Sequence, residues 1–208
     1  MQLEVLNIQG NKTGRQVELS DAVFGIEPHE QSVWLAVKAF LANQRQGTHK
    51  AKQRNEIAGS TRKLHKQKGT GGSRKGSIKN PLYHGGGRVH GPQPRDYSEK
   101  LNKKVKSLAR RSVLSVKAQA GQIMVVEDFS LDAPKTQQYL SILSNLNISD
   151  KKTLVLLEDV NTNVYLSSRN LENSSVKVAS EFNVHEVLKS NCLVISEKAL
   201  KVITDSLG

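Results

Sequence analysis

Hydrophobic and polar positions divide the chain into two structured blocks separated by a long stretch without periodicity. In the first block, residues 2–8 alternate and predict a strand, and residues 16–19 predict its partner across a glycine-bounded turn. A helix opened by Pro28 then runs to Asn43. The inward-facing positions expected in this block are Leu3, Val5, Leu6, Ile8, Val33, Val37, Phe40 and Leu41, with Trp34 widening the helix face.

The second block begins with a helix whose predicted N-cap is Ser98 and which ends near Gly121. Its expected buried positions are Leu101, Val105, Leu108, Ser112 and Val116. Its other face carries basic residues at helical spacing: Lys103, Lys106, Arg110 and Lys117, flanked by Lys104 and Arg111. A solvated surface and a nucleic-acid contact explain this basic face equally well.

From there, short apolar runs alternate with helical patterns. Strands are predicted at 123–126, 153–157, 176–179 and 192–195, and helices at 134–146, 160–171, 184–188 and from the cap residue Ser196 onward. The side chains expected to pack inward from these helices are Tyr139, Leu140, Leu143, Tyr165, Leu200, Ile203 and Leu207. Runs such as 153–157 are apolar on both faces, which is typical of a parallel sheet covered by helices on both sides.

The predicted fold class is therefore α/β, a three-layer sandwich with a mostly parallel central sheet, plus a long extended basic internal loop. Residues 1–43 and 99–208 form the predicted globular body, and residues 44–98 form the loop. Folded out and back, this loop could extend ~90 Å at ~3.3 Å per residue. A compact body of this size has a radius of only ~16 Å.

Charge is concentrated in the loop. Residues 44–98 hold thirteen Lys and Arg against two acids, Glu56 and Asp96, so the loop carries +11 of the chain's net charge of +12. Ten of the fifteen glycines lie there as well, and such a segment cannot order itself by burying apolar surface. A polyanion, with RNA as the obvious candidate, is the expected partner. A disordered basic tail is a weaker interpretation, because such tails are usually terminal and repetitive.

The chain offers little catalytic chemistry. The glycine-rich run 69–77 resembles a phosphate-binding loop, but the Walker spacing from Gly71 leads to Gly76 followed by Ser77 and Ile78, without the required lysine. Glu127-Asp128 and Glu158-Asp159 follow predicted strands, where helix N-terminal charges explain them better than catalysis does. No nucleophile pairs with a base. We therefore expect no enzyme, cofactor or metal site.

Other features set bounds on location. Cys192 is the single cysteine, which excludes an internal disulfide and fits a reducing compartment. No apolar run approaches the ~18 residues of a membrane span, and the N-terminus has no secretory-signal pattern. We expect no membrane partner. Two alternatives remain open: an RNA-modifying α/β enzyme with a basic arm, and a free-standing nucleic-acid chaperone.

Specific short sequence motifs in the loop and directly after it resemble a known family. Arg45-Gln46-Gly47-Thr48, Gln67-Lys68-Gly69-Thr70-Gly71, Gly76-Ser77-Ile78-Lys79-Asn80-Pro81 and Leu101-Asn102-Lys103-Lys104-Val105 occur in that order. Outside the loop, Ala133-Pro134-Lys135-Thr136 and Arg169-Asn170-Leu171 continue the match. The chain resembles, end to end, the bacterial form of large-subunit (50S) ribosomal protein four, the universal L-four family.

The resemblance implies a structural constituent of the large ribosomal subunit, cytoplasmic and with a role in translation. It implies a primary rRNA-binding protein that acts early in assembly, with its loop buried in 23S rRNA and lining part of the polypeptide exit tunnel. The implied partners are 23S rRNA, neighbouring large-subunit proteins and the nascent peptide near the loop tip.

The residues expected to bind rRNA lie mainly in the loop. They are Arg45, Gln46, Thr48, Lys50, Lys52, Arg54, Arg62, Lys63, Lys66, Lys68, Gly69, Gly71, Arg74, Lys75, Ser77, Lys79, Tyr83, Arg88, Arg95, Lys103, Lys104, Arg110 and Arg111. The predicted tunnel tip is Lys63, Leu64, His65, Lys66, Gln67 and Lys68. Leu64 and His65 replace a Pro-Trp pair that is usual in the family, which removes a ring that could stack.

Overall fold

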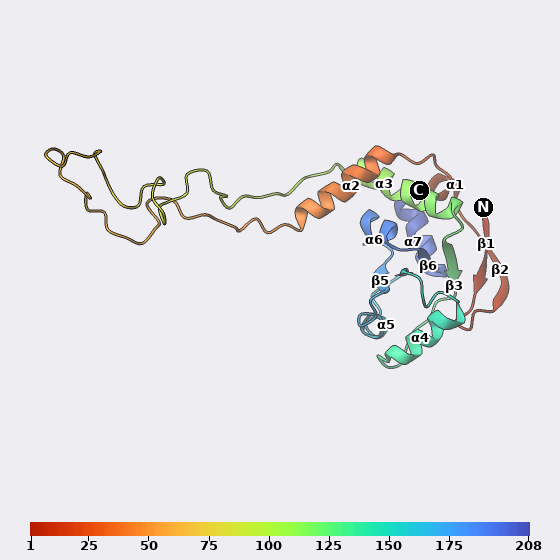
Figure 1. Cartoon of the computed structure of the whole chain (residues 1–208). Helices are drawn as coiled ribbons and strands as arrows, with labels where there is room; N and C mark the ends of the chain where they lie inside the picture. The colour runs from red at the N-terminus through yellow and green to blue at the C-terminus, as the bar shows by residue number, and fades with distance from the viewer. The chain divides into compact units, whose positions relative to one another are not determined.

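The structure is a computed structural model that describes residues 1–208. It divides into two compact units, one formed by residues 1–41 and 100–208 and the other by residues 42–99. The first unit holds the sheet and the helices around it (Figure 1). No helix or strand occurs between residues 44 and 102. No helix is long and apolar enough to cross a membrane.

Six strands form one sheet in the order β2-β1-β3-β6-β4-β5. The strands are β1 (Gln2–Leu6), β2 (Lys12–Glu18), β3 (Ile123–Val126), β4 (Thr153–Leu157), β5 (Ser174–Val178) and β6 (Cys192–Ser196). Only the β1–β2 pair is antiparallel, and the other four pairings are parallel. The predicted α/β class with a mostly parallel sheet is confirmed.

Seven helices accompany the sheet. They are α1 (Asp21–Phe24), α2 (Glu30–Asn43), α3 (Lys103–Gln119), α4 (Thr136–Asn145), α5 (Thr162–Ser168), α6 (Val184–Lys189) and α7 (Glu197–Leu207). The short helix α1 is absent from the sequence prediction. The central strand β4 is buried at all five positions, as its apolar run indicates.

Alternate residues of β4 belong to two hydrophobic clusters. Leu154 and Leu156 pack with residues of α1, α3, α6 and α7, whereas Val155 and Leu157 pack with residues of α4 and α5. Because successive side chains of a strand point to opposite faces, the two clusters cover opposite faces of the sheet. Both clusters lie within the first unit.

The last helix follows its sequence pattern closely. The Ser196 hydroxyl accepts a hydrogen bond from the Ala199 N–H at 3.3 Å, which caps α7 as predicted. Leu200, Ile203 and Leu207 are buried in the first cluster, which confirms all three inward positions.

The predicted start of α3 is wrong. The helix begins at Lys103 after the N-cap Asn102, not at Ser98. The N–H and hydroxyl groups of Ser98 both donate to Asp96 Oδ1, at 2.8 and 2.6 Å. Ser98 is therefore committed to a local turn with Asp96 and does not cap the helix.

The predicted faces of α3 are also partly wrong. Val116 is 43% exposed, while Lys117, assigned to the basic outer face, is 7% exposed. The Lys117 Nζ donates to the Ser190 carbonyl oxygen at 2.6 Å and to Gln122 Oε1 at 2.8 Å. The helix packs against both α1 and α6, so its buried face is wider than a single stripe and includes the Lys117 stem.

Several other expected core positions are exposed: Ile8, Trp34, Leu41, Leu140 and Tyr165. Strand β1 ends at Leu6, so Ile8 lies in the following turn. Helix α4 buries Tyr139 and Leu143 as predicted, and α5 is only seven residues long, so it buries little beyond Val164, Ser167 and Ser168.

Candidate nucleic-acid interface

The second unit has no regular secondary structure, but backbone hydrogen bonds join its two halves. From the root toward the tip, these bonds run from Arg95 N–H to Gly47 O, from Ala51 N–H to Pro92 O, from Arg88 N–H to Lys52 O and from Leu64 N–H to Gly76 O, at 3.0–3.1 Å. We call residues 44–64 the outgoing limb and residues 76–98 the returning limb. The two limbs therefore contact each other at intervals along the loop.

At the root of the loop, two guanidinium groups lie over the Tyr97 ring. Arg45 Cζ is 3.8 Å from the ring centre and Arg95 Cζ is 4.4 Å from it. Gly47, at φ +65°, fits closely here, because a Cβ at this position would lie 2.1 Å from the Arg95 carbonyl oxygen and 3.0 Å from the Tyr97 ring. The limbs approach this closely only because residue 47 has no side chain.

A second close approach occurs further along the loop. A Cβ on Gly87 would lie 2.4 Å from the Arg54 backbone nitrogen on the opposite limb. Gly87 is buried, and its N–H donates to the Lys79 carbonyl oxygen at 3.1 Å. Packing between the limbs thus explains Gly87, whereas Gly86 packs against Asn80 of its own limb and Gly85 has a positive φ.

The predicted tip lies in open space. All six predicted tip residues, Lys63, Leu64, His65, Lys66, Gln67 and Lys68, are exposed. Lys63 Nζ donates to Gln67 Oε1. Gly69 and Gly71 have positive φ, and no atom lies within 4 Å of the Cβ that either would carry. The tip therefore makes few contacts of its own.

Both acids of the loop are satisfied locally. Glu56 pairs with Lys50 and accepts the Gln53 N–H at 3.1 Å, and these hydrogen bonds lower the pKa of its carboxyl. Asp96 accepts the hydroxyl and N–H of Ser98, which lowers its pKa in the same way. Because both carboxylates stay ionised and bonded within the loop, they leave most of its cations unneutralised.

The other predicted contact residues of the loop are mostly exposed. Those classed as exposed are Arg45, Gln46, Thr48, Lys50, Lys52, Arg54, Arg62, Lys63, Lys66, Lys68, Gly69, Gly71, Arg74, Arg88 and Arg95, and those half-buried are Lys75, Ser77, Lys79 and Tyr83. Lys50 is the one cation of the loop in an ion pair. The loop thus presents a dense set of unpaired positive charges to its surroundings, and its RNA-binding residues stay predictions.

The four predicted contact residues on α3 differ from one another. Lys103 and Lys104 are exposed in its first turn. Arg110 is half-buried, with its guanidinium 5.1 Å from the Phe182 ring centre, and burial lowers its pKa. Arg111 is half-buried, and its Nε is buried without a hydrogen-bond partner. Arg110 therefore packs within the first unit, whereas Lys103 and Lys104 face solvent.

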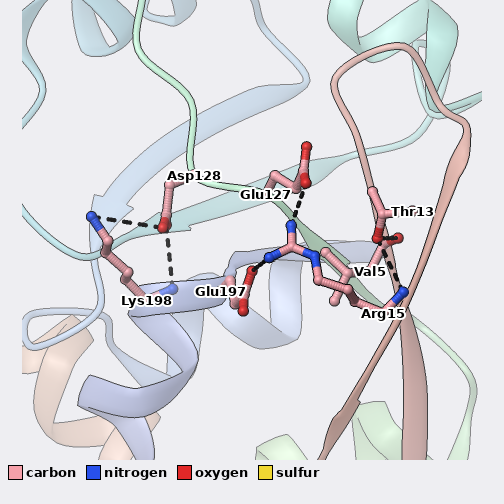
Figure 2. Close-up of polar contacts among 7 residues, drawn as sticks. All are labelled: Val5, Thr13, Arg15, Glu127, Asp128, Glu197 and Lys198. Carbon is pink, nitrogen blue, oxygen red and sulfur yellow. Dashed lines mark hydrogen bonds and ion pairs between the residues drawn. The ribbon is translucent and has the colours of Figure 1, made fainter.

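Three of the four carboxylates that follow strands β3 and β4 are engaged in ion pairs, and Figure 2 shows the pairs of Glu127 and Asp128. Arg15 of β2 bonds to Glu127, which follows β3, and to Glu197 of α7 at 3.1 Å. Beside Arg15, the Thr13 hydroxyl donates to the Val5 carbonyl oxygen at 2.8 Å, where β1 and β2 have a bulge. This network links the hairpin to the rest of the sheet.

Of these carboxylates, only Asp128 bonds to the N-terminus of a helix, as predicted for all four. Asp128 Oδ1 accepts the N–H of Lys198 in the first turn of α7 at 3.3 Å, and the Lys198 Nζ lies 3.9 Å from both Asp128 and Glu158. Glu127 instead binds Arg15, and α5 is capped by Asn161 rather than by Glu158 or Asp159.

The cavity next to these residues, about 490 Å³, shows no catalytic arrangement. It is lined by Asp128, Phe129, Leu157, Glu158, Asp159, Val160, Asn161, Thr162, Asn163, Ser196 and Lys198. Asp128, Glu158 and Lys198 lie in structural ion pairs, and no nucleophile stands beside a base. No group of three or more His, Cys, Asp or Glu side chains could hold a metal ion.

Sequence patterns alone miss the contacts between limbs. The Arg95-x-Tyr97 spacing is visible in the sequence, but Arg45 reaches the same ring from the other limb. Composition therefore predicts where an interface lies, but it does not show which residues support the shape of the loop.

A glycine-rich, unpaired cationic loop attached to an α/β unit without a catalytic arrangement is typical of a structural polyanion-binding protein. The family model "Ribosomal protein L4/L1 family" matches residues 17–206. The chain belongs to this family, whose members are structural and not enzymes. The predicted family and the expectation of a non-enzymatic protein are thereby confirmed.

Curated relatives match over the whole chain. The large ribosomal subunit protein uL4 of Flavobacterium psychrophilum is 58% identical over 208 residues, which is 100% of both chains. The protein of the same name from Phocaeicola vulgatus is 55% identical over 208 residues, again 100% of both. That of Bacteroides fragilis is 54% identical over 207 residues, covering 100% of each chain.

Proposed function

We propose that this chain is a structural constituent of the large ribosomal subunit, acts in translation and binds 23S rRNA through residues 44–98. The observation that carries the proposal is the set of unpaired cations on a loop without regular secondary structure. Each cation that neutralises a phosphate releases counterions, and this release drives RNA binding without sequence preference.

The proposal divides the chain by role. The body is a three-layer α/β sandwich, supported by the two clusters on opposite faces of the sheet, and it serves as a folded anchor. The loop is the rRNA-binding element, supported by its separate set of internal contacts. In this account the exposed Lys103 and Lys104 of α3 also contact RNA.

Early action in assembly follows from the chemistry of the loop. A segment with few contacts of its own orders best when RNA folds around it, so it must bind before the RNA becomes compact. The exposed tip, Lys63–Lys68, then reaches the wall of the exit tunnel and meets the nascent peptide. In this proposal the chain also contacts neighbouring large-subunit proteins, and it lies in the cytoplasm as part of the ribosome.

A crosslinking map tests the proposed function directly. The full chain is bound to 23S rRNA, and its lysines are joined to RNA with an amine-directed crosslinker. The loop lysines Lys52, Lys66 and Lys68 should crosslink strongly, while Lys151 and Lys201, which are exposed in the body, serve as matched controls. Equal crosslinking of loop and body lysines would contradict the proposal.

A further inference from the structure

A cavity of about 870 Å³ lies between the two limbs of the loop, away from the predicted tip. It is lined by Gln53, Arg54, Asn55, Thr61, Ser77, Lys79, Asn80, Pro81, Gly87, Arg88 and Val89. Its volume falls within the range of about 300–1,000 Å³ that small-molecule-sized ligands occupy. All of its walls belong to the second unit.

The walls of the cavity offer two kinds of chemistry. Arg54, Lys79 and Arg88 are cations that form no ion pair within the protein, and this set suits a phosphate group. Gln53 and Asn55 add side-chain amides, each of which both donates and accepts hydrogen bonds. Neither side-chain amide is hydrogen-bonded to another protein group; Gln53 bonds only through its backbone, donating its N–H to Glu56 Oε2 and accepting the Glu56 N–H at its carbonyl oxygen.

The acid nearest in sequence to these residues does not oppose an anionic ligand. Glu56 does not line the cavity, and its carboxylate is held by Lys50 and by the Gln53 N–H. The cavity therefore combines unneutralised positive charge with unused base-recognition groups. Pro81 and Val89 supply apolar contact surface for a flat ring.

Backbone contacts fix the shape of the cavity. The Arg88 N–H donates to the Lys52 carbonyl oxygen at 3.0 Å, and Gly87 lies against the Arg54 backbone. The returning limb is turned locally as well, since the Tyr83 N–H donates to Asn80 O at 3.0 Å. The limbs are thus held together at this point rather than crossing it as free strands.

We infer that this cavity holds one unstacked nucleotide of the RNA, with its phosphate on the cations and its base edge on Gln53 and Asn55. Sequence-specific RNA recognition usually targets such splayed-out bases through hydrogen bonds to their edges. Phosphate contacts position a protein, whereas base contacts specify the sequence. The cavity therefore gives base specificity to the loop, whereas the other cations of the loop bind RNA without regard to sequence. The inference rests on the proposed function.

The test compares variants of the full chain on two RNAs. Asn55→Ala and the double variant Gln53→Ala/Asn55→Ala remove amides that make no hydrogen bond within the protein, so the loop should keep its shape. Arg74→Gln is the control, because Arg74 is exposed and lies outside this cavity. Affinity is measured on a 23S rRNA fragment protected by the wild-type chain and on a structured RNA of equal length and scrambled sequence.

The double amide variant should lose about tenfold in affinity for the rRNA fragment and nothing for the scrambled RNA. Its salt slope should be unchanged. Arg74→Gln should weaken binding to both RNAs equally and reduce the salt slope by about one. Amide variants that weaken both RNAs equally, or neither, overturn the inference. Absence of salt-dependent RNA binding by the wild-type chain would instead overturn the proposed function.

Discussion

The guanidinium of Arg45 lies over the ring of Tyr97, with Cζ 3.8 Å from the ring centre, and so joins the outgoing limb to the returning limb at the root of the loop. Arg95 approaches the same ring at 4.4 Å. Near the protein surface, each cation over an aromatic ring contributes about 0.5–1 kcal/mol. This pair of contacts therefore sets how firmly the limbs are held together where the loop begins.

Replacing Tyr97 should loosen the root. In Tyr97→Ala, the amide of Arg95, bonded to the Gly47 carbonyl oxygen, should exchange with solvent about tenfold faster, because both stacking contacts are lost. Tyr97→Phe keeps the ring and should exchange like the wild-type chain. Hydrogen exchange read by mass spectrometry checks both variants. Unchanged exchange in Tyr97→Ala would show that the ring does not hold the limbs together.

Glycine substitutions separate packing from flexibility. Gly87→Ala places a Cβ 2.4 Å from the Arg54 nitrogen, so the limbs must move apart and affinity for 23S rRNA should fall about tenfold. Gly72→Ala is the matched control, because Gly72 has no positive φ and no atom lies within 4 Å of the added Cβ. Filter binding on one rRNA fragment compares them. Equal losses in both variants would refute the packing role assigned to Gly87.

Elements that depend on a pattern within one short segment of the sequence are predicted correctly. Strand β4 is a continuous apolar run, and α7 has a serine cap followed by apolar residues at helical spacing, so both are predicted correctly. The basic loop is visible because no packing pattern interrupts its charge. Periodicity does not fix how wide a buried face is, which explains the error at Lys117, now bonded to the Ser190 carbonyl oxygen.

Contacts between distant segments lie beyond such patterns. Ser98 has the residue type of an N-cap, but Asp96 competes for its hydrogen bonds. The cavity between the limbs combines residues 53–61 with residues 77–89, and no spacing in the sequence places these side chains together. Composition thus predicts the kind of partner, whereas the arrangement of side chains that could select one nucleotide requires the structure.

The buried phenol of Tyr139 predicts a loss of stability at alkaline pH. Burial raises the pKa of Tyr139 to about 12, above the value of about 10 in an unfolded chain. The folded state then binds the proton more tightly, so this stabilisation is complete below about pH 10 and is lost as the pH rises through 12. The two-unit shift corresponds to about 2–3 kcal/mol.

Tyr139→Phe isolates this effect. The variant loses the hydrogen bond to the Ser174 hydroxyl, 2.8 Å in the wild-type chain, and should be less stable by about 1 kcal/mol at pH 8. Between pH 10 and 12 its free energy of unfolding should fall less steeply than that of the wild-type chain. Urea unfolding at several pH values measures both. Parallel curves would show that Tyr139 does not titrate differently on unfolding.

The central claim is that residues 44–98 bind rRNA through their unpaired cations, and the salt dependence of binding tests it most directly. The full chain is compared with a variant in which a Gly-Ser linker replaces residues 46–96. The variant should still melt cooperatively, because both hydrophobic clusters lie in the other unit. The logarithm of the full chain's affinity should fall steeply with the logarithm of salt concentration, by about 0.7–0.9 per phosphate contacted. The variant should bind weakly with a much shallower slope, and an equally steep slope would contradict the claim.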